Sequence, residues 1–239
     1  MSAGFAGKVA FVAGGTGGLG RAVSLAFLEA GAKVIVTYRK QEEFDGLKNA
    51  AAANSTRLAG HAVDATDESQ VDKLIAACVA LHGRLDILVN TVGGYKGGAT
   101  LWETDTKVLD QMISLNLRAG FLLLRAVVPV MLKQGDGSIV NIAAKAALGP
   151  AAKGAVYAAS KAAAVAMMEA LAAEVKGTGV RVNSVLPSII DTEANRRAMP
   201  KADFAKWPKP EDIARVILFL CSDDAKVIHG AAIPVYGDS

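Results

Sequence analysis

Short runs of β-branched and other apolar residues alternate along this chain with longer segments whose apolar residues recur at helical spacing. The short runs predict strands at residues 8–13, 33–38, 58–63, 85–90, 138–143, 180–186 and 231–236. The longer segments predict helices at residues 18–30, 68–81, 105–133, 156–176 and 210–221. Because strands and helices alternate, we expect an α/β fold with about seven parallel strands in one doubly wound sheet and helices on both faces.

The predicted elements follow one another without a linker-like low-complexity stretch or an internal repeat. The chain has 239 residues, 52% of them hydrophobic, so we expect a single domain over residues 1–239. Residues 187–210 are the exception, because they are polar, irregular and too long for a simple connection. Segments of this kind are often functional, and we expect a substrate loop or lid there.

Charge and targeting signals narrow the class of protein. The 26 lysines and arginines are scattered and exceed the 23 acidic residues only slightly, so no nucleic-acid partner is expected. The longest apolar runs, at 121–131 and 162–171, are interrupted by Arg125 and Glu169, and we expect neither to cross a membrane. No basic leader with a cleavable apolar segment opens the sequence, so the expected location is the cytoplasm.

The cysteines and histidines do not suggest metal chemistry. Cys78 and Cys221 lie far apart within apolar helical patterns, which predicts buried thiols. His61, His82 and His229 are each isolated from any spacing typical of metal ligands, so we expect no metal site.

A glycine-rich loop follows the first predicted strand and leads directly into a helix. This arrangement binds dinucleotides, because a side chain would keep the backbone from the pyrophosphate and the helix amino end offers free N–H groups. It predicts a Rossmann-type fold and a nicotinamide dinucleotide as cofactor. The expected pyrophosphate-binding residues are Gly14, Gly15, Thr16, Gly17, Gly18, Leu19 and Gly20.

The end of the second predicted strand bears on the choice between NADPH and NADH. An acid usually stands there to bind the ribose 2′-hydroxyl, whereas this chain has no carboxylate at Tyr38, Arg39 or Lys40. Arg39 can pair with a 2′-phosphate, so NADPH is favoured and NADH is possible. Alternatively, Arg39 and Lys40 only begin a solvated helix. Asp64, just after the third predicted strand, is placed to contact the adenine or to cap the next helix.

Tyr157 and Lys161 stand four residues apart at the start of an alanine-rich helix, hence on one face. A nearby ammonium lowers the pKa of a phenol and favours phenolate. With Asn116, the glycine loop and the turn from Asn90 to Gly93, the whole chain resembles the short-chain dehydrogenases/reductases. The resemblance implies that Tyr157 is the general acid/base, that Lys161 binds the nicotinamide ribose and tunes Tyr157, and that Asn116 supports a proton relay. It also implies cofactor contacts at Asn90 and Gly93.

One member of that family's usual catalytic set is missing. The serine expected thirteen residues before the tyrosine is Ala144, with no hydroxyl beside it. Such a serine hydrogen-bonds a reacting carbonyl oxygen, and loss of one donor typically lowers the rate about a hundred- to a thousand-fold. An ordinary ketone reductase is therefore disfavoured. Two explanations compete: the protein does not catalyse, or its substrate does not need that donor.

Several loop sequences resemble one branch of the family, the dihydropteridine reductases, which also lack the serine. They lie at residues 93–98, 143–148, 186–187, 191–192 and 195–207. The resemblance implies hydride transfer from the nicotinamide to a quinonoid dihydropterin or a similar planar conjugated acceptor, with Tyr157 as proton donor. Such a ring spreads the incoming negative charge, so a serine is not needed. Cofactor contacts at Pro187 and Thr192 are implied as well.

The chain departs from this branch at two places. The branch prefers NADH and has an acid at the end of the second strand, where this chain has Tyr38 and Arg39. It has a tryptophan where this chain has Tyr95, whose ring would either stack on a flat substrate or only pack the loop.

Substrate contacts are expected from Ala144, Tyr95, Met199 and Trp207. Met199 and Trp207, together with Phe204, would form a lid over the pocket. An apolar patch that buries the segment against its own domain explains these three residues equally well.

Other functions and the assembly stay open. One alternative is a carbonyl reductase or alcohol dehydrogenase whose missing donor comes from water or Ser188. Another is a catalytically silent, cofactor-binding sensor protein, although such a protein would not need a phenol whose pKa is shifted by a neighbouring ammonium.

The resemblance implies a homodimer or homotetramer built from the helix at 156–176 and the helix containing Asn116. High helix propensity explains the alanines of 156–176 without a partner.

Overall fold

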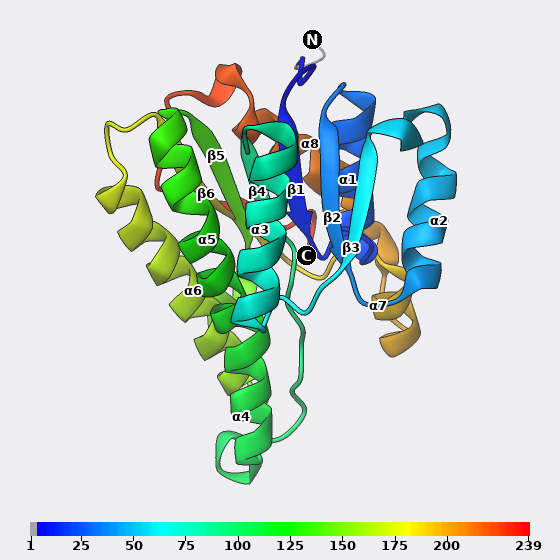
Figure 1. Ribbon diagram of the computed structural model, residues 1–239. Helices are drawn as coiled ribbons and strands as arrows, with labels where there is room; N and C mark the ends of the chain where they lie inside the picture. The colour runs from blue at the N-terminus through cyan, green and yellow to red at the C-terminus, as the bar shows by residue number, and fades with distance from the viewer. Residues whose placement is uncertain (1–3) are drawn as a thin grey trace.

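A sheet of seven parallel strands forms the centre of the computed structural model, which describes residues 4–239 (Figure 1). The strands lie in the order β3-β2-β1-β4-β5-β6-β7. The chain moves outward from β1 to β3 and then crosses back to β4 on the other side of β1, which confirms the predicted doubly wound α/β fold. In such sheets ligands bind where the strand order reverses, outside the carboxyl ends of the strands.

The strand bounds agree with the sequence prediction to within two residues. The strands are β1 Val9–Ala13, β2 Lys33–Tyr38, β3 Leu58–Ala62, β4 Ile87–Asn90, β5 Gly137–Ile142, β6 Val180–Pro187 and β7 Ala232–Val235. The α-helices are α1 Gly18–Glu29, α2 Gln41–Ala51, α3 Glu68–His82, α4 Thr106–Ile113, α5 Ala119–Gln134, α6 Ala155–Glu174, α7 Glu193–Ala198 and α8 Pro210–Cys221. Strands β1, β4 and β5 are buried along their whole length, as expected for parallel strands covered on both faces.

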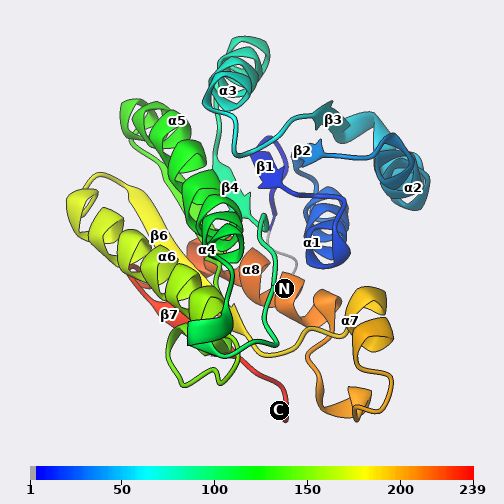
Figure 2. The same ribbon diagram turned by 90° about the horizontal axis from the view of Figure 1, so that it is seen from below.

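Helices cover both faces of the sheet (Figure 2). Helices α3, α5 and α6 share one apolar core with the sheet, in which Phe11 and Leu123 are buried. Helices α1, α2 and α8 share the other core, with Phe27 and Ile217. Figure 2 looks toward the carboxyl ends of the strands, where the loops leading into α1, α4 and α7 gather.

Three features differ from the sequence prediction. Helix α2 is an additional helix with a weak apolar period, since Leu47 and Ala51 are its buried residues. The helix expected at 105–133 contains a π-helical turn, Ser114–Arg118, between α4 and α5. The segment 187–210, expected to be irregular, contains the short helix α7. Of these, the π turn is the one most often associated with functional sites.

Two helical stretches, Thr106–Gln134 and Ala155–Glu174, are long and apolar enough to cross a membrane by length and composition. These helices are longer than the apolar runs at 121–131 and 162–171 because they extend beyond them at both ends. Helices α5 and α6, which make up most of these stretches, lie on the sheet, and buried residues such as Val127 and Met168 belong to the core beneath them. Their apolar character thus has an explanation in the packing of the domain.

The two cysteines are free and buried, as predicted. Burial raises the pKa of the Cys78 thiol to about 11 and that of the Cys221 thiol to about 12. Within residues 4–239, His, Cys, Asp and Glu side chains form no group of three or more that could hold a metal ion.

Candidate active site

The glycine loop joins β1 to α1 where the strand order reverses. Gly14 has a left-handed φ of +73°, and its N–H donates to Thr37 Oγ1 at 2.8 Å. A Cβ on Gly20 would lie 2.1 Å from Gly14 O, and one on Gly18 would lie 2.7 Å from Thr192 Cγ2. Among the described residues, no side chain caps the first turn of α1, so its N–H groups are free for an anion. The loop therefore fits the pyrophosphate of a dinucleotide.

The other predicted cofactor-binding residues of the glycine loop, and Pro187, lie against different parts of the fold. A Cβ on Gly15 would lie 2.4 Å from a Val36 methyl carbon, so the loop runs directly against β2 there. Gly17 is the N-cap residue of α1, and Leu19 is buried in the core beneath that helix. Pro187 is buried at the end of β6.

At the adenosine end, Arg39 follows β2 directly and is exposed. Glu43, in the first turn of α2, accepts a hydrogen bond from Thr16 Oγ1 at 3.1 Å and lies 3.7 Å from Lys40 Nζ. The end of β2 has no carboxylate, as the sequence shows, but α2 brings the carboxylate of Glu43 to the phosphate loop. The available signal in the sequence was an acidic residue, Glu43, soon after the second strand. The apolar pattern did not predict the helix α2 that contains it.

Asp64 lies in the loop between β3 and α3 and is exposed. Its Oδ1 accepts hydrogen bonds from the N–H and the hydroxyl of Thr66, both at 2.8 Å. The N-cap of α3 is Asp67, whose Oδ1 accepts from Gln70 N at 3.0 Å. The interpretation of Asp64 as a helix cap is therefore wrong, and its contact with adenine stays a prediction.

Tyr157 and Lys161 lie in the first turns of α6. Lys161 is only 6% exposed, and its Nζ donates to Ile142 O at 2.8 Å. Burial lowers the pKa of Lys161 from 10.5 to about 8, while burial and a smaller effect of Tyr95 raise the pKa of Tyr157 to about 12. The expectation of a lowered phenol pKa is therefore wrong, because the desolvation of Tyr157 dominates. At neutral pH the phenol keeps its proton.

Asn116 lies in the π turn and is buried. Its Oδ1 accepts from Gly94 N at 2.9 Å, while its Nδ2 donates to Gly94 O and to Ser160 Oγ, both at 3.0 Å. Ser160 Oγ in turn donates to Tyr157 O at 2.7 Å. Asn116 thus ties the turn after β4 to the start of α6. Ser160 is a site residue that sequence reasoning missed, and its place directly before Lys161 was the available signal.

The turn after β4 runs close to these side chains. A Cβ on Gly93 would lie 3.0 Å from Lys161 Nζ, so the backbone approaches the lysine where only glycine fits easily. Asn90 is buried; its Nδ2 donates to Asn141 Oδ1 at 2.9 Å and its Oδ1 accepts from Val92 N at 3.1 Å. Asn90 therefore braces β4 against β5 and the turn, and its contact with a cofactor stays a prediction.

Ala144 follows β5 and is buried, with no hydroxyl of its own to offer. Ser188, the alternative donor, donates to Tyr236 O at 2.6 Å and accepts from Ser239 Oγ at 2.7 Å. Its hydroxyl hydrogen is therefore engaged with the segment after β7. Ser188 would have to leave Tyr236 before it could donate to a substrate.

Tyr95 contacts Tyr157, whereas Trp207 packs on a residue of its own segment. The Tyr95 ring is 67% exposed and meets the Tyr157 ring edge to face, with centroids 4.9 Å apart. Trp207 is buried and packs on Phe204, with centroids 5.0 Å apart, and Met199 is half-buried. The burial of Trp207 favours the interpretation that it anchors its own segment to the domain.

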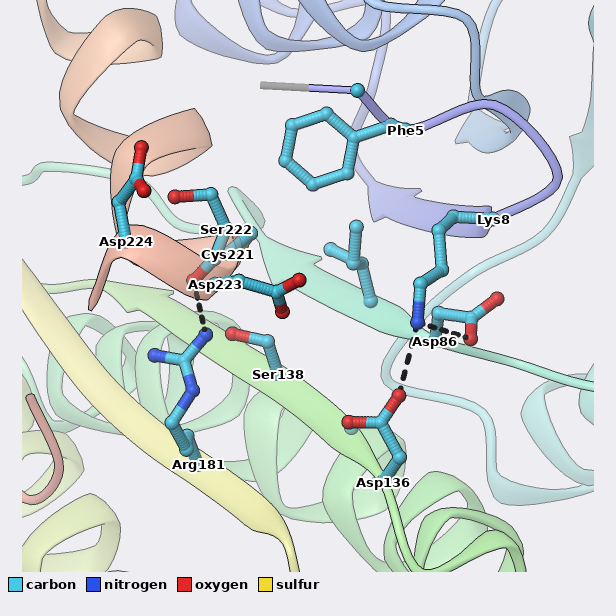
Figure 3. A pocket seen from close by; sticks show the side chains of 13 residues that line it. Phe5, Lys8, Asp86, Asp136, Ser138, Arg181, Cys221, Ser222, Asp223 and Asp224 are labelled. Atoms are coloured by element: carbon cyan, nitrogen blue, oxygen red, sulfur yellow. Dashed lines mark hydrogen bonds and ion pairs between the residues drawn. The ribbon is translucent and has the colours of Figure 1, made fainter. Parts of the chain in front are cut away.

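A separate cavity of about 320 Å³ lies at the opposite edge of the sheet, near the amino ends of β4, β5 and β6 (Figure 3). Lys8 Nζ lies 3.0 Å from Asp136 and 3.4 Å from Asp86. Burial alone raises the pKa of Asp86, but hydrogen bonds from Arg84 and from Val9 N bring it below its ordinary value. Lys8, Asp86 and Asp136 thus pair with one another at the end of the sheet opposite the candidate catalytic groups.

Comparisons with known proteins agree with this geometry. A family model described as short chain dehydrogenase matches residues 8–203. The 3-oxoacyl-[acyl-carrier-protein] reductase FabG of Thermotoga maritima is 33% identical over 97% of this chain and 97% of its own. The structure of ElxO with NADP bound has a TM-score of 0.91 at 28% identity and covers 96% and 97% of the two chains. Carveol dehydrogenase from Mycobacterium avium in complex with NAD has a TM-score of 0.89 at 26% identity, with 97% of each chain covered.

Proposed function

Since this chain belongs to the short chain dehydrogenase family and is an NAD(P)-dependent oxidoreductase, we propose that it reduces a planar conjugated acceptor such as a quinonoid dihydropterin. The observation that carries this proposal is the buried Ala144 in a chain that retains Tyr157, Lys161 and Asn116. A ketone concentrates negative charge on one oxygen and needs a fixed donor there. A conjugated ring spreads that charge, so an alanine is tolerated.

Tyr157 is the proposed proton donor. Its pKa of about 12 keeps the phenol protonated at neutral pH, which is the form required to deliver H⁺ during a reduction. The bound nicotinamide supplies the hydride. Lys161 lies one helical turn from Tyr157 on α6, which supports its proposed roles of binding the nicotinamide ribose and stabilising the phenolate left after proton transfer. Asn116 and Ser160 fix the start of α6 relative to the turn at Gly94 through hydrogen bonds.

The exposure of Tyr95 is consistent with a flat substrate that stacks on its ring. One edge contact with Tyr157 fixes the ring, and most of its surface stays open for stacking. Met199 remains a proposed substrate contact from the segment 187–210. Trp207 then acts through the position of that segment and not through direct contact.

A carbonyl reductase is the second candidate, favoured by the 33% identity to a 3-oxoacyl-[acyl-carrier-protein] reductase. In this chain it would have to work without a serine at Ala144 and with Ser188 engaged by Tyr236. A water molecule would then have to hold the reacting oxygen. The silent sensor is the least supported candidate, because a binder needs no Tyr157 and Lys161 pair.

Assembly and location complete the proposal. Phe121 and Leu132 are exposed on α5, and Ala159 and Ala166 are exposed on α6. These faces suit a homodimer, or a homotetramer with further contacts, because apolar surface of this kind gains from burial. A cytoplasmic location stays a prediction.

The test measures the disappearance of NADPH and NADH absorbance with purified protein and two sets of acceptors. Rapid oxidation with quinonoid dihydropterin and slow oxidation with simple ketones supports the proposal. The reverse pattern identifies a carbonyl reductase. Cofactor binding without oxidation by any acceptor identifies the sensor.

A further inference from the structure

The carboxylate of Glu43 lies beside the phosphate loop although it belongs to the second βα unit. Its Oε2 accepts from Thr16 Oγ1 at 3.1 Å, and its Oε1 lies 3.7 Å from Lys40 Nζ. Thr16 belongs to the loop that fits the pyrophosphate, and Lys40 follows Arg39 at the end of β2. In doubly wound dinucleotide sites the adenosine ribose lies between these two features. Glu43 therefore borders the ribose position.

The first turn of α2 is fixed, so the place of Glu43 is not accidental. The Tyr38 and Phe44 rings stack with centroids 4.9 Å apart and planes 8° apart. Phe44 lies so close to Gly60 in β3 that a Cβ there would be 2.2 Å from the ring. Tyr38 OH also donates to Gln41 Oε1 at 2.7 Å. These contacts hold α2 on β2 and β3 and direct Glu43 toward the loop.

Glu43 and Arg39 have opposite preferences for the ribose 2′ position. A carboxylate accepts a hydrogen bond from a 2′-hydroxyl and repels a 2′-phosphate, whereas a guanidinium binds the phosphate. Arg39 is exposed and has no ion pair within residues 4–239, so it is available to the cofactor. Lys40 partly neutralises Glu43, which weakens the repulsion of a phosphate.

We infer that Glu43 is the ribose-binding acid of this chain and that, together with Arg39, it lets one site accept both NADH and NADPH. The inference rests on the proposed use of a nicotinamide cofactor. In this arrangement the acid that binds the ribose comes from α2 and not from the end of β2. Glu43 would bind NADH through the 2′-hydroxyl, and Arg39 would bind NADPH through the 2′-phosphate.

Equilibrium binding tests this without any turnover. Purified wild-type, Glu43→Gln and Arg39→Ala proteins are titrated with NADH and with NADPH, and nicotinamide fluorescence reports the Kd values. Glu43→Gln should weaken NADH about tenfold, as expected for one charge-assisted hydrogen bond, and should tighten NADPH several-fold. Arg39→Ala should weaken NADPH by a similar factor and leave NADH nearly unchanged.

Glu42→Gln is the matched control, because Glu42 is an exposed acid in the same helical turn. It removes the same charge, and within residues 4–239 it has no contact with Thr16. An equal shift of the NADH to NADPH affinity ratio in Glu42→Gln and Glu43→Gln would overturn the inference, and so would an unchanged ratio in Glu43→Gln. A folded wild-type protein that binds neither nucleotide would instead refute the proposed function itself.

Discussion

Replacing Lys161 by methionine should stabilise the folded protein at neutral pH while abolishing turnover. Burial lowers the pKa of Lys161 from 10.5 to about 8, so the folded protein holds an ammonium in an unfavourable environment below pH 8. At about 1.4 kcal/mol for each pKa unit, this costs about 3 kcal/mol. Loss of the hydrogen bond to Ile142 O offsets about 1 kcal/mol. The expected net gain is about 2 kcal/mol.

The pH dependence gives the sharper test. The folded-state pKa of Lys161 lies below the unfolded value, so the unfolded chain binds more protons between pH 8 and pH 10.5. Wild-type stability therefore gains from this group as pH rises through that window. The advantage of Lys161→Met should shrink by most of that 3 kcal/mol between pH 7 and pH 10. Urea unfolding, followed by circular dichroism at both pH values, measures the difference.

Lys107→Met is the control, because Lys107 is an exposed lysine in the first turn of α4. Its pH dependence reports the loss of one surface charge without the release of a buried one. A stability difference between wild type and Lys161→Met that stays constant from pH 7 to pH 10 would refute the reasoning. Lys161 would then not be the desolvated ammonium that its burial implies.

Further predictions concern proton transfer, the phosphate loop, helix α2 and the opposite edge of the sheet. Tyr157→Phe should lower kcat about 10²- to 10⁴-fold, while circular dichroism should show an intact fold. Ala144→Ser should leave dihydropterin turnover within several-fold of the wild-type value. A large gain in turnover from the serine would contradict the proposal. Gly20→Ala should lower Tm and abolish NADPH binding, because its Cβ would lie 2.1 Å from a backbone oxygen. Gly46→Ala, with nothing within 4 Å of the new Cβ, should stabilise α2 by up to about 1 kcal/mol. Asp86→Asn should destabilise the protein in urea at pH 7, because Lys8 and Arg84 lose this carboxylate partner, and this loss should vanish as the pH falls below the lowered pKa of Asp86.

The strands and most of the helices could be predicted because burial leaves a local mark on the sequence. Strands such as β1 and β4 are covered on both faces, so their sequences are nearly continuous apolar runs. The glycine loop and the pair Tyr157 and Lys161 were equally accessible, since their residues are close in sequence and their spacing carries the chemistry.

Residues whose role depends on contacts between distant segments were not accessible in this way. Glu43 reaches Thr16 only because a stack of Tyr38 on Phe44 places α2 against the sheet. Ser160 and Asn116 meet across 44 residues of sequence, through a π turn that has no apolar signature. No local pattern encodes such encounters.

The sequence by itself determined the doubly wound α/β class, the phosphate loop, the Tyr157 and Lys161 pair and the missing serine at Ala144. All of these rest on residue type and short spacing. Only the tertiary structure decided the direction in which the pKa values of Tyr157 and Lys161 shift, because desolvation depends on everything packed around a group and not on its neighbours in the chain. For the same reason, only the tertiary structure showed that Glu43 lies beside Thr16 and that Trp207 is buried against Phe204.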